Sequence, residues 1–406
     1  MTPPTADPAT DGERHASWVE LFFDLIAVAG VSVLATVLEG EVSFRALLVY
    51  AVLFGAFWMC WTTFMVYGNV RGEGTRVMRL MVGMFGIGVM SATVPGVADA
   101  VLSGQHDRGA LAAFALTYFL VRTVGSRAFE ELLVLDVPAV QGSLGAVPWL
   151  ISIWVDDVHL RIALWALGLA IDAFTMLVVS GADAQEHSEA RLNALGRRVP
   201  AGDERARRRW ERLRPVAVRV APEHLAERLG LFVIIVLGEG VMQAVHAAAG
   251  VTGEGGLFLA GLVSFVVLAA IFGVSVWHGY AGVPHLVPGG LPLRLAVGAH
   301  GLVSATLAAV AVSLASVIAH RTEPLADAQR WLLCGGVAVY FLIGAAAASG
   351  RSRRTVVGLV GSAVVVLAVG LAGSGLAATA QAAIVAATLL AHLAVERRRP
   401  APGEVG

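Results

Sequence analysis

The sequence predicts an all-α, polytopic membrane protein, and its composition and its repeated apolar runs are the observations that predict this class. Hydrophobic residues make up 57% of the 406 residues and charged residues only 15%, far from the average of a soluble globular protein. Apolar runs of about 20 residues, enough to cross a bilayer as a helix, recur along the chain. The lipid bilayer is therefore an expected partner, and a net charge of -1 gives no reason to expect nucleic acid.

Twelve runs qualify as membrane spans. They lie at 18–38, 44–66, 77–98, 110–131, 137–155, 159–181, 222–249, 255–279, 291–319, 328–349, 354–372 and 376–396. The fifth run is the least regular, because Gln141, Gly142, Gly145 and Pro148 interrupt it. We expect about twelve transmembrane helices.

Arginine supplies all 29 basic residues, and its distribution predicts the orientation of the spans. With the N-terminus inside, 24 arginines fall on the cytoplasmic side. The five on the opposite side are Arg45, Arg108, Arg161, Arg321 and Arg330. Because cytoplasmic loops collect arginine, both termini are expected in the cytoplasm. The lack of lysine suggests a high-GC bacterial genome, so we expect the inner membrane of a bacterial cell.

One long polar segment, 182–221, divides the chain into two six-helix halves at 18–181 and 222–396. The tails at 1–17 and 397–406 are expected in the cytoplasm, the first of them disordered. The segment between the halves carries ten arginines and is expected to be a solvated cytoplasmic linker. Alternatively, it lies on anionic lipid headgroups, where each Arg contributes roughly 1 kcal/mol. The linker interpretation is favoured because membrane topology already explains the arginines.

A short internal similarity indicates that the two halves are repeats. The residues VELFFDLI at 19–26 resemble AERLGLFV at 226–233 and pair Glu20 with Glu227. Six spans separate the two segments, so the halves share one orientation, as in parallel-repeat transporters.

Carboxylates inside the first apolar run are the most informative feature of the chain. Glu20 and Asp24 are one helical turn apart, so their side chains share a face. Charged groups are costly in hydrocarbon, and an intramembrane acid is by default a candidate functional residue. Glu20 could instead be a simple partner of the helix N-terminus, whereas Asp24 is a turn deeper.

The seventh run holds the second group of ionisable residues. His224, Glu227 and Arg228 stand at its cytoplasmic entrance, where a structural role is at least as plausible as a functional one. Glu239 lies roughly 25 Å from the start of this run, beyond the reach of snorkelling from the cytoplasmic side. Function is therefore favoured over structure at Glu239, as it is at Asp24.

Three more polar side chains fall inside apolar runs, namely Arg122, Asp172 and His300. With Asp24 and Glu239 they form a set suited to proton handling, since burial favours a neutral carboxyl and a nearby guanidinium favours a charged one. The alternative is a network of ion pairs that holds the helices together. For the set as a whole, the two interpretations are equally supported.

The residues ELFFDLIAV at 20–28 and PEHLAERLGLFVIIVLGEG at 222–240 resemble the bacterial low temperature requirement A family of multi-pass membrane proteins. The resemblance covers roughly 18–395, and it implies roles for the motif residues Glu20, Asp24, His224, Glu227, Arg228 and Glu239. The family name records a link to growth in the cold, and no accepted substrate or reaction comes with it.

No cofactor or metal is expected. Cys60 and Cys334 lie far apart in apolar runs, and the spacing of His224 from nearby acids differs from the zinc-hydrolase signature. The favoured function is a proton-linked secondary transporter or exchanger of an unknown small substrate, with its site between the opening helices of the two halves. One alternative, less favoured, is an intramembrane enzyme that acts on a lipid or apolar substrate. Another is a non-catalytic protein of cold or membrane adaptation.

Overall fold

The structure, a computed structural model, describes residues 15–39, 42–104, 107–129, 132–178, 186, 190, 216–251, 255–278, 291–348 and 353–397. Its α-helices are α1 (Trp18–Ala35), α2 (Phe44–Arg71), α3 (Val77–Ala98), α4 (Arg108–Arg127), α5 (Val147–Ser152), α6 (Val158–Val178), α9 (Pro222–Ala249), α10 (Leu257–His278), α11 (Leu293–Ala319), α12 (Asp327–Ala348), α13 (Arg353–Ala372) and α14 (Ala378–Arg397). Most of the expected disordered tail at 1–17 and most of the expected linker at 182–221 lie outside the described residues.

Short elements join these helices. They are the 3-10 turns η1 (Thr36–Leu38), η2 (Gly72–Gly74), η4 (Pro138–Val140), η5 (Leu144–Ala146) and η6 (Gly373–Gly375), the π turn η3 (Asp99–Ser103), and the strands β1 (Leu132–Val134) and β2 (Val216–Val218). The prediction of an all-α fold is confirmed, and the two strands are the only β structure longer than a single bridge within the described residues.

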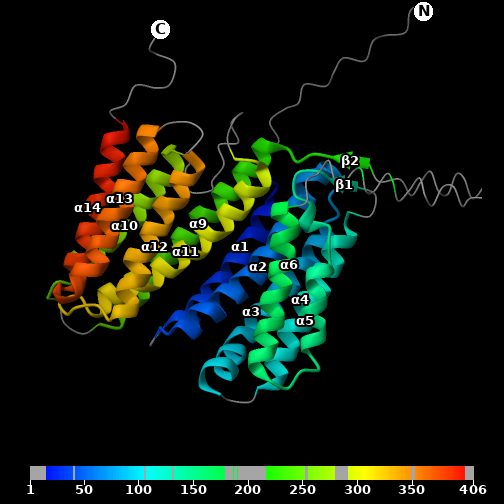
Figure 1. Cartoon of the computed structure of the whole chain (residues 1–406), viewed down its shortest axis with the longest axis horizontal. Coiled ribbons are helices and arrows are strands. Elements are labelled where there is room, and N and C mark those ends of the chain that lie inside the picture. The colour runs from blue at the N-terminus through cyan, green and yellow to red at the C-terminus, as the bar shows by residue number, and fades with distance from the viewer. Residues whose placement is uncertain are drawn as a thin grey trace, which may run out of the picture.

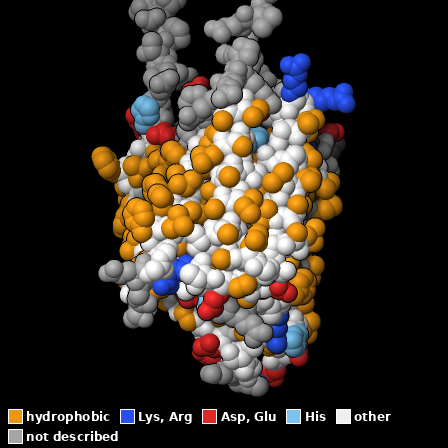
Figure 2. Space-filling view, turned by 90° about the vertical axis from the view of Figure 1, so that its left-hand side faces the viewer, with side chains coloured by type: hydrophobic (Ala, Val, Ile, Leu, Met, Phe, Trp, Pro, Cys, Tyr) orange, Lys and Arg blue, Asp and Glu red, His pale blue; other side chains and the backbone are white. Residues whose placement is uncertain are grey.

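Eleven helices of the described part are long and apolar enough to cross a membrane. Many of their large hydrophobic side chains, such as Phe85, Phe258 and Leu371, are exposed on the outside of the bundle. Figure 2 shows such side chains over the middle of one face, with charged side chains toward its two ends. This distribution suits a hydrocarbon layer between two aqueous phases. The chain is therefore a multi-pass membrane protein.

Local sequence signals set several helix ends. Ser17, Ser43 and Asp107 each cap a helix by accepting a hydrogen bond from the backbone N–H three residues later. Pro222 occupies the first turn of α9, where its missing N–H costs no hydrogen bond. Pro95 lies inside α3, and the π turn η3 follows it, consistent with the backbone disruption that an internal proline causes.

The fifth expected span, 137–155, does not form a transmembrane helix, because only α5 is α-helical there and the 3-10 turns η4 and η5 precede it. The segment still crosses the bundle: Arg122 donates to Ala139 O at 3.1 Å, and Asp156 pairs with Arg108 at 3.2 Å. Those two arginines are about 21 Å apart along α4, at 1.5 Å per residue. The interrupting glycines, glutamine and proline noted in the sequence explain why this crossing is irregular.

The two strands tie the end of α4 to the start of α9. Leu132, Leu133 and Val134 of β1 pair in parallel with Val216, Ala217 and Val218 of β2. The tie continues where Val220 N donates to Asp136 Oδ2 at 3.0 Å. The second half of the chain therefore begins firmly attached to the first.

The helices alternate in direction, and the start of α1 lies at the same end of the molecule as the end of α14 (Figure 1). In the first half α1 packs on α2 and α3, α3 on α4, α2 on α6, and α5 on α6. In the second half α9 packs on α10 and α11, α11 on α12, α10 on α14, and α13 on α14. Between the halves α1 contacts α9, and α11 contacts α1, α2 and α6.

Candidate functional site

A buried arginine joins helices α1 and α9. Arg228 on α9 holds Asp24 on α1 with two parallel hydrogen bonds, from Nε to Oδ2 at 2.7 Å and from Nη2 to Oδ1 at 2.5 Å. Its Nη1 lies 3.3 Å from Oε1 of Glu20, one turn earlier on α1. Each of the three residues is at most 2% exposed, so solvent barely screens these contacts.

Glu20 is held in place by the start of its own helix. Ser17 donates to Oε2 of Glu20 from its backbone N at 2.9 Å and from its hydroxyl at 2.8 Å, completing a capping box. On the facing helix α2, a Cβ added at Gly68 would lie 2.5 Å from Oε1 of Glu20. The glycine therefore provides the space that the carboxylate occupies.

His224, one turn before Arg228, faces the same carboxylate with its Nε2 3.4 Å from Oε2 of Glu20. Its Nδ1 lies 3.1 Å from Nδ2 of Asn69. Ala221 fixes the orientation of the Asn69 amide, because its N–H donates to Oδ1 at 2.7 Å and its carbonyl accepts from Nδ2 at 2.9 Å. The ring therefore accepts at Nδ1 and carries its proton on Nε2, which makes it neutral.

We call Glu20, Asp24, His224 and Arg228 the Arg228 cluster. With both acids ionised, it contains two carboxylates, one guanidinium and one neutral imidazole. Its net charge is then one negative unit, and one bound proton would neutralise it. A buried group with one more carboxylate than cation is suited to take up and release a proton.

An aromatic layer closes the inner side of the cluster. Trp61 donates from Nε1 to Oδ1 of Asp24 at 2.7 Å. His300 on α11 stacks on Trp58, with ring centroids 5.0 Å apart, and donates from Nε2 to Leu229 O at 2.8 Å. Trp61 also stacks on His300, with ring centroids 6.2 Å apart, and therefore links His300 to Asp24.

Arg122 and Asp172 form a separate buried pair inside the first half, here called the Arg122 pair. Nη2 of Arg122 lies 3.3 Å from Oδ1 of Asp172, and Tyr118 donates to Oδ2 at 3.3 Å. The guanidinium also donates to the hydroxyl of Thr63 and to the carbonyls of Ala139 at 3.1 Å and Gly142 at 2.9 Å. One acid thus balances one base.

Glu239 and Glu227 join neither group. Glu239 lies about 16 Å beyond Arg228 along α9, where Oγ of Ser32 donates to its Oε1 at 2.5 Å. Glu227 stays at the end of the bundle, where it accepts from the backbone N of Ala16 at 3.1 Å. Both carboxylates are half-buried.

The nine candidate residues therefore lie at several places. The structure brings Glu20, Asp24, His224 and Arg228 into direct contact, separates Arg122 with Asp172, and leaves Glu227, Glu239 and His300 apart from both groups. Sequence reasoning missed three contributors, Ser17, Asn69 and Trp61. Only Ser17 had a local signal, the Ser-x-x-Glu pattern of a capping box.

Within the described residues, no group of three or more His, Cys, Asp or Glu side chains is placed to hold a metal ion. Cys60 and Cys334 are both buried and free.

A family model described as "Bacterial low temperature requirement A protein (LtrA)" matches residues 15–395. The match spans nearly the whole chain and includes every candidate residue. No curated protein matches the chain, and no solved structure matches it.

Proposed function

The chain belongs to the bacterial low temperature requirement A family, and on that premise we propose that it is a proton-linked secondary transporter of the bacterial inner membrane. The substrate is a small molecule, and the transport site lies between α1 and α9. The observation that carries the proposal is the surplus acid of the Arg228 cluster, where one guanidinium serves two buried carboxylates.

Because of the position of this cluster, binding of a proton there would alter the contact between the two halves. Glu20 and Asp24 belong to the opening helix of one half, and His224 and Arg228 to the opening helix of the other. A proton on the cluster therefore changes the attraction between the two halves at one end of the molecule. A transporter alternates between two conformations, in which the halves are arranged differently. Coupling to protons requires the cluster to have a different proton affinity in each conformation.

Two observations support the idea that the halves are parallel repeats. The helices of each half pack in a similar order, with α1, α2 and α3 corresponding to α9, α10 and α11. In the alignment of 19–26 with 226–233, Ser32 corresponds to Glu239, and these two side chains are in contact. Equivalent positions of a two-fold pair meet at the symmetry axis.

That axis would run along the membrane normal between α1 and α9, beside Ser32 and Glu239. Binding sites of repeat transporters lie near the bilayer midplane at the interface between the repeats. We therefore assign Glu239 to the substrate or proton site and the Arg228 cluster to a proton-controlled contact nearer the chain termini.

Full-length protein in liposomes with an imposed pH gradient tests the proposal. A library of small solutes is screened for those whose addition dissipates the gradient, read by a pH-sensitive dye. We expect Asp24→Asn and Glu239→Gln to abolish the signal. The control Glu223→Gln removes an exposed acid from the same helix and should retain it. Equal signals in all four proteins would refute the proposal.

A second measurement needs no substrate. Infrared difference spectra of the purified protein across a pH series report which carboxyl groups and imidazoles change protonation. We expect the wild-type spectra to show a titrating group. Its signal should disappear or move to a different pH in Glu20→Gln and stay unchanged in Asp172→Asn. A spectrum in which neither change alters any titrating group contradicts a proton-binding role for the cluster.

A further inference from the structure

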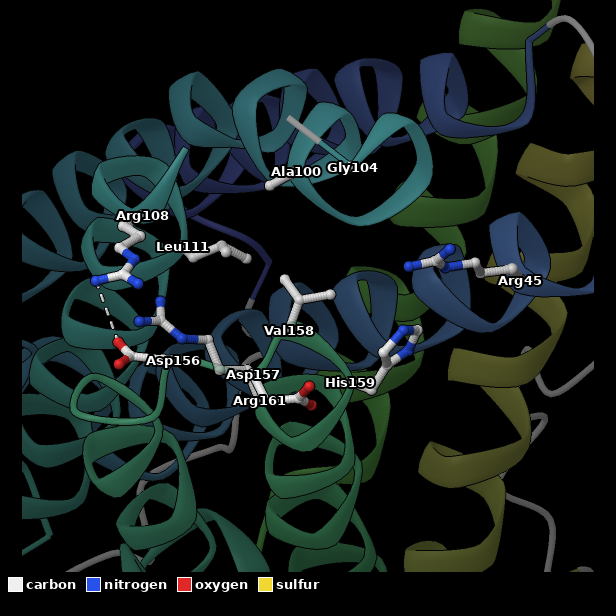
Figure 3. Close-up of a pocket in the computed structure, with 10 residues that line it drawn as sticks. All are labelled: Arg45, Ala100, Gly104, Arg108, Leu111, Asp156, Asp157, Val158, His159 and Arg161. Carbon is white, nitrogen blue, oxygen red and sulfur yellow. Dashed lines mark ion pairs between the residues drawn. The ribbon is translucent and has the colours of Figure 1, made fainter. Parts of the chain in front are cut away.

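Three helices of the first half begin around a cavity at the end of the molecule opposite the start of α1. The cavity has a volume of about 270 Å³ and lies among the N-terminal ends of α2, α4 and α6 (Figure 3). Its basic lining residues are Arg45, Arg108, His159 and Arg161. The positive ends of three helix dipoles thus meet three guanidinium groups.

The two acids that line the cavity do not neutralise all of this positive charge. Asp156 pairs with Arg108 at 3.2 Å, and Asp157 accepts from the backbone N of Leu160 at 2.7 Å at the start of α6. Within the described residues, Arg45 and Arg161 form no ion pair with a carboxylate within 4.0 Å. Two cationic side chains therefore face one cavity with no carboxylate of the described residues within 4.0 Å, and the nearby Asp156, already paired with Arg108, attracts Arg161 only from a longer distance.

Arg161 is the less expected of the two, because it is only 3% exposed. Its Nε donates to Val155 O and its Nη2 to Ile153 O at 3.4 Å, which fixes the guanidinium in the cavity wall. Its Nη1 is buried and has no hydrogen-bond partner among the described residues. A buried N–H without a partner costs free energy, and an anion in the cavity could remove that cost.

We propose that this cavity binds a small oxyanion, a phosphate or carboxylate group, held by Arg45 and Arg161. Forked guanidinium groups suit the geometry of such anions, and helix N-termini add to the attraction. These arginines are also among the five that the charge distribution places outside, where arginine is otherwise scarce. The oxyanion is carried either by a soluble molecule outside the cell or by an anionic lipid of the outer leaflet.

Thermal unfolding of the full-length protein in neutral detergent tests the site. Inorganic phosphate is titrated against chloride at constant ionic strength, and the shift of the unfolding temperature gives an apparent affinity. We expect phosphate to stabilise the wild type. The variants Arg45→Gln and Arg161→Lys should bind phosphate at least about tenfold more weakly than the wild type. Arg321→Gln removes a cation that the charge distribution also places outside, and it should behave as wild type.

The proposal is overturned if the wild type and Arg45→Gln bind phosphate with equal affinity. It is also overturned if the wild type binds neither phosphate nor phosphatidylglycerol. Arg45 is exposed at the start of its helix, so this variant should fold even if Arg161→Lys does not. Native mass spectrometry from nanodiscs of phosphatidylglycerol or phosphatidylcholine identifies the source. Retention of phosphatidylglycerol by wild type and not by Arg45→Gln indicates a headgroup, and phosphate binding without retained lipid indicates a soluble anion.

Discussion

The Arg228 cluster and the Arg122 pair both bury an arginine against an acid from another helix, yet they differ in composition and in position. Arg122 meets one acid, and its other hydrogen bonds go to a hydroxyl and two backbone carbonyls of the first half. Arg228 meets two acids, and both belong to the other half. The comparison teaches that burial alone does not identify a functional ion pair. Two other properties distinguish a functional ion pair better: whether its charges balance, and whether it connects the two halves or lies within one of them.

The largest expected effect tests whether the Arg122 pair is structural. Arg122→Met leaves Asp172 buried without its cation and should lower the free energy of unfolding by about 3–5 kcal/mol. Denaturant titration of the purified protein in detergent, followed by tryptophan fluorescence, measures it. Adding Asp172→Asn to this variant should restore part of the loss. A loss below about 1 kcal/mol, the scale of an exposed ion pair, would contradict a structural role.

The same neutralisation should act differently in the two groups. Asp172→Asn removes the one carboxylate that pairs with Arg122 among the described residues and should cost about 1–3 kcal/mol of unfolding free energy. Glu20→Gln removes the surplus charge of the Arg228 cluster, glutamine still completes the capping box, and Asp24 still pairs with Arg228, so this variant should lose less stability than Asp172→Asn. Transport should nevertheless be lost. If Glu20→Gln destabilises as much as Asp172→Asn, the two groups do not differ in charge balance.

Two glycines sharpen the comparison, because each gives an acid its space. A Cβ at Gly145 would collide with the carboxylate of Asp172, and one at Gly68 would collide with Glu20. We expect Gly145→Ala to cost about 1–3 kcal/mol of stability and Gly68→Ala to change mainly the pH dependence of transport. The control is Gly88→Ala, where a Cβ meets nothing within 4 Å. Similar unfolding energies and transport for all three variants would count against these roles.

The smallest expected effect concerns Ser32, which donates to Glu239. Ser32→Ala should change the free energy of unfolding by only about 0.5–1.5 kcal/mol while reducing proton-linked transport. Ser91→Ala is the matched control, since that hydroxyl donates to Ile87 O of its own helix at 2.8 Å. Transport rates that fall equally in both variants would show that contact with Glu239 has no special role.

The sequence predicted the fold class because hydrophobicity and span length follow directly from composition. Glu20, Asp24 and Arg228 were also identifiable, since an ionisable residue inside an apolar run is conspicuous. Their mutual contact was not, because it depends on how α1 and α9 pack. The same limit applies to Asn69, whose partners Ala221 and His224 lie more than 150 positions away.

The fifth crossing shows why hydropathy alone was insufficient in one region. An apolar run at 137–155 satisfies the length criterion, but its glycines and proline favour turns over a continuous helix. Backbone carbonyls without a helical hydrogen bond there accept hydrogen bonds from side chains of neighbouring helices, such as Arg122 and Arg161. These compensations are long-range and leave no periodic pattern in the sequence.

That crossing has a consequence for biogenesis. A segment whose carbonyls depend on Arg122 of α4 and Arg161 of α6 is poorly suited to leave the translocon for lipid on its own, because a bilayer offers no donors to exposed backbone. It should enter the membrane only together with the helices on either side of it. Substitutions at either arginine are thus expected to lower the fraction of chains that insert correctly, and with it the yield of purified protein.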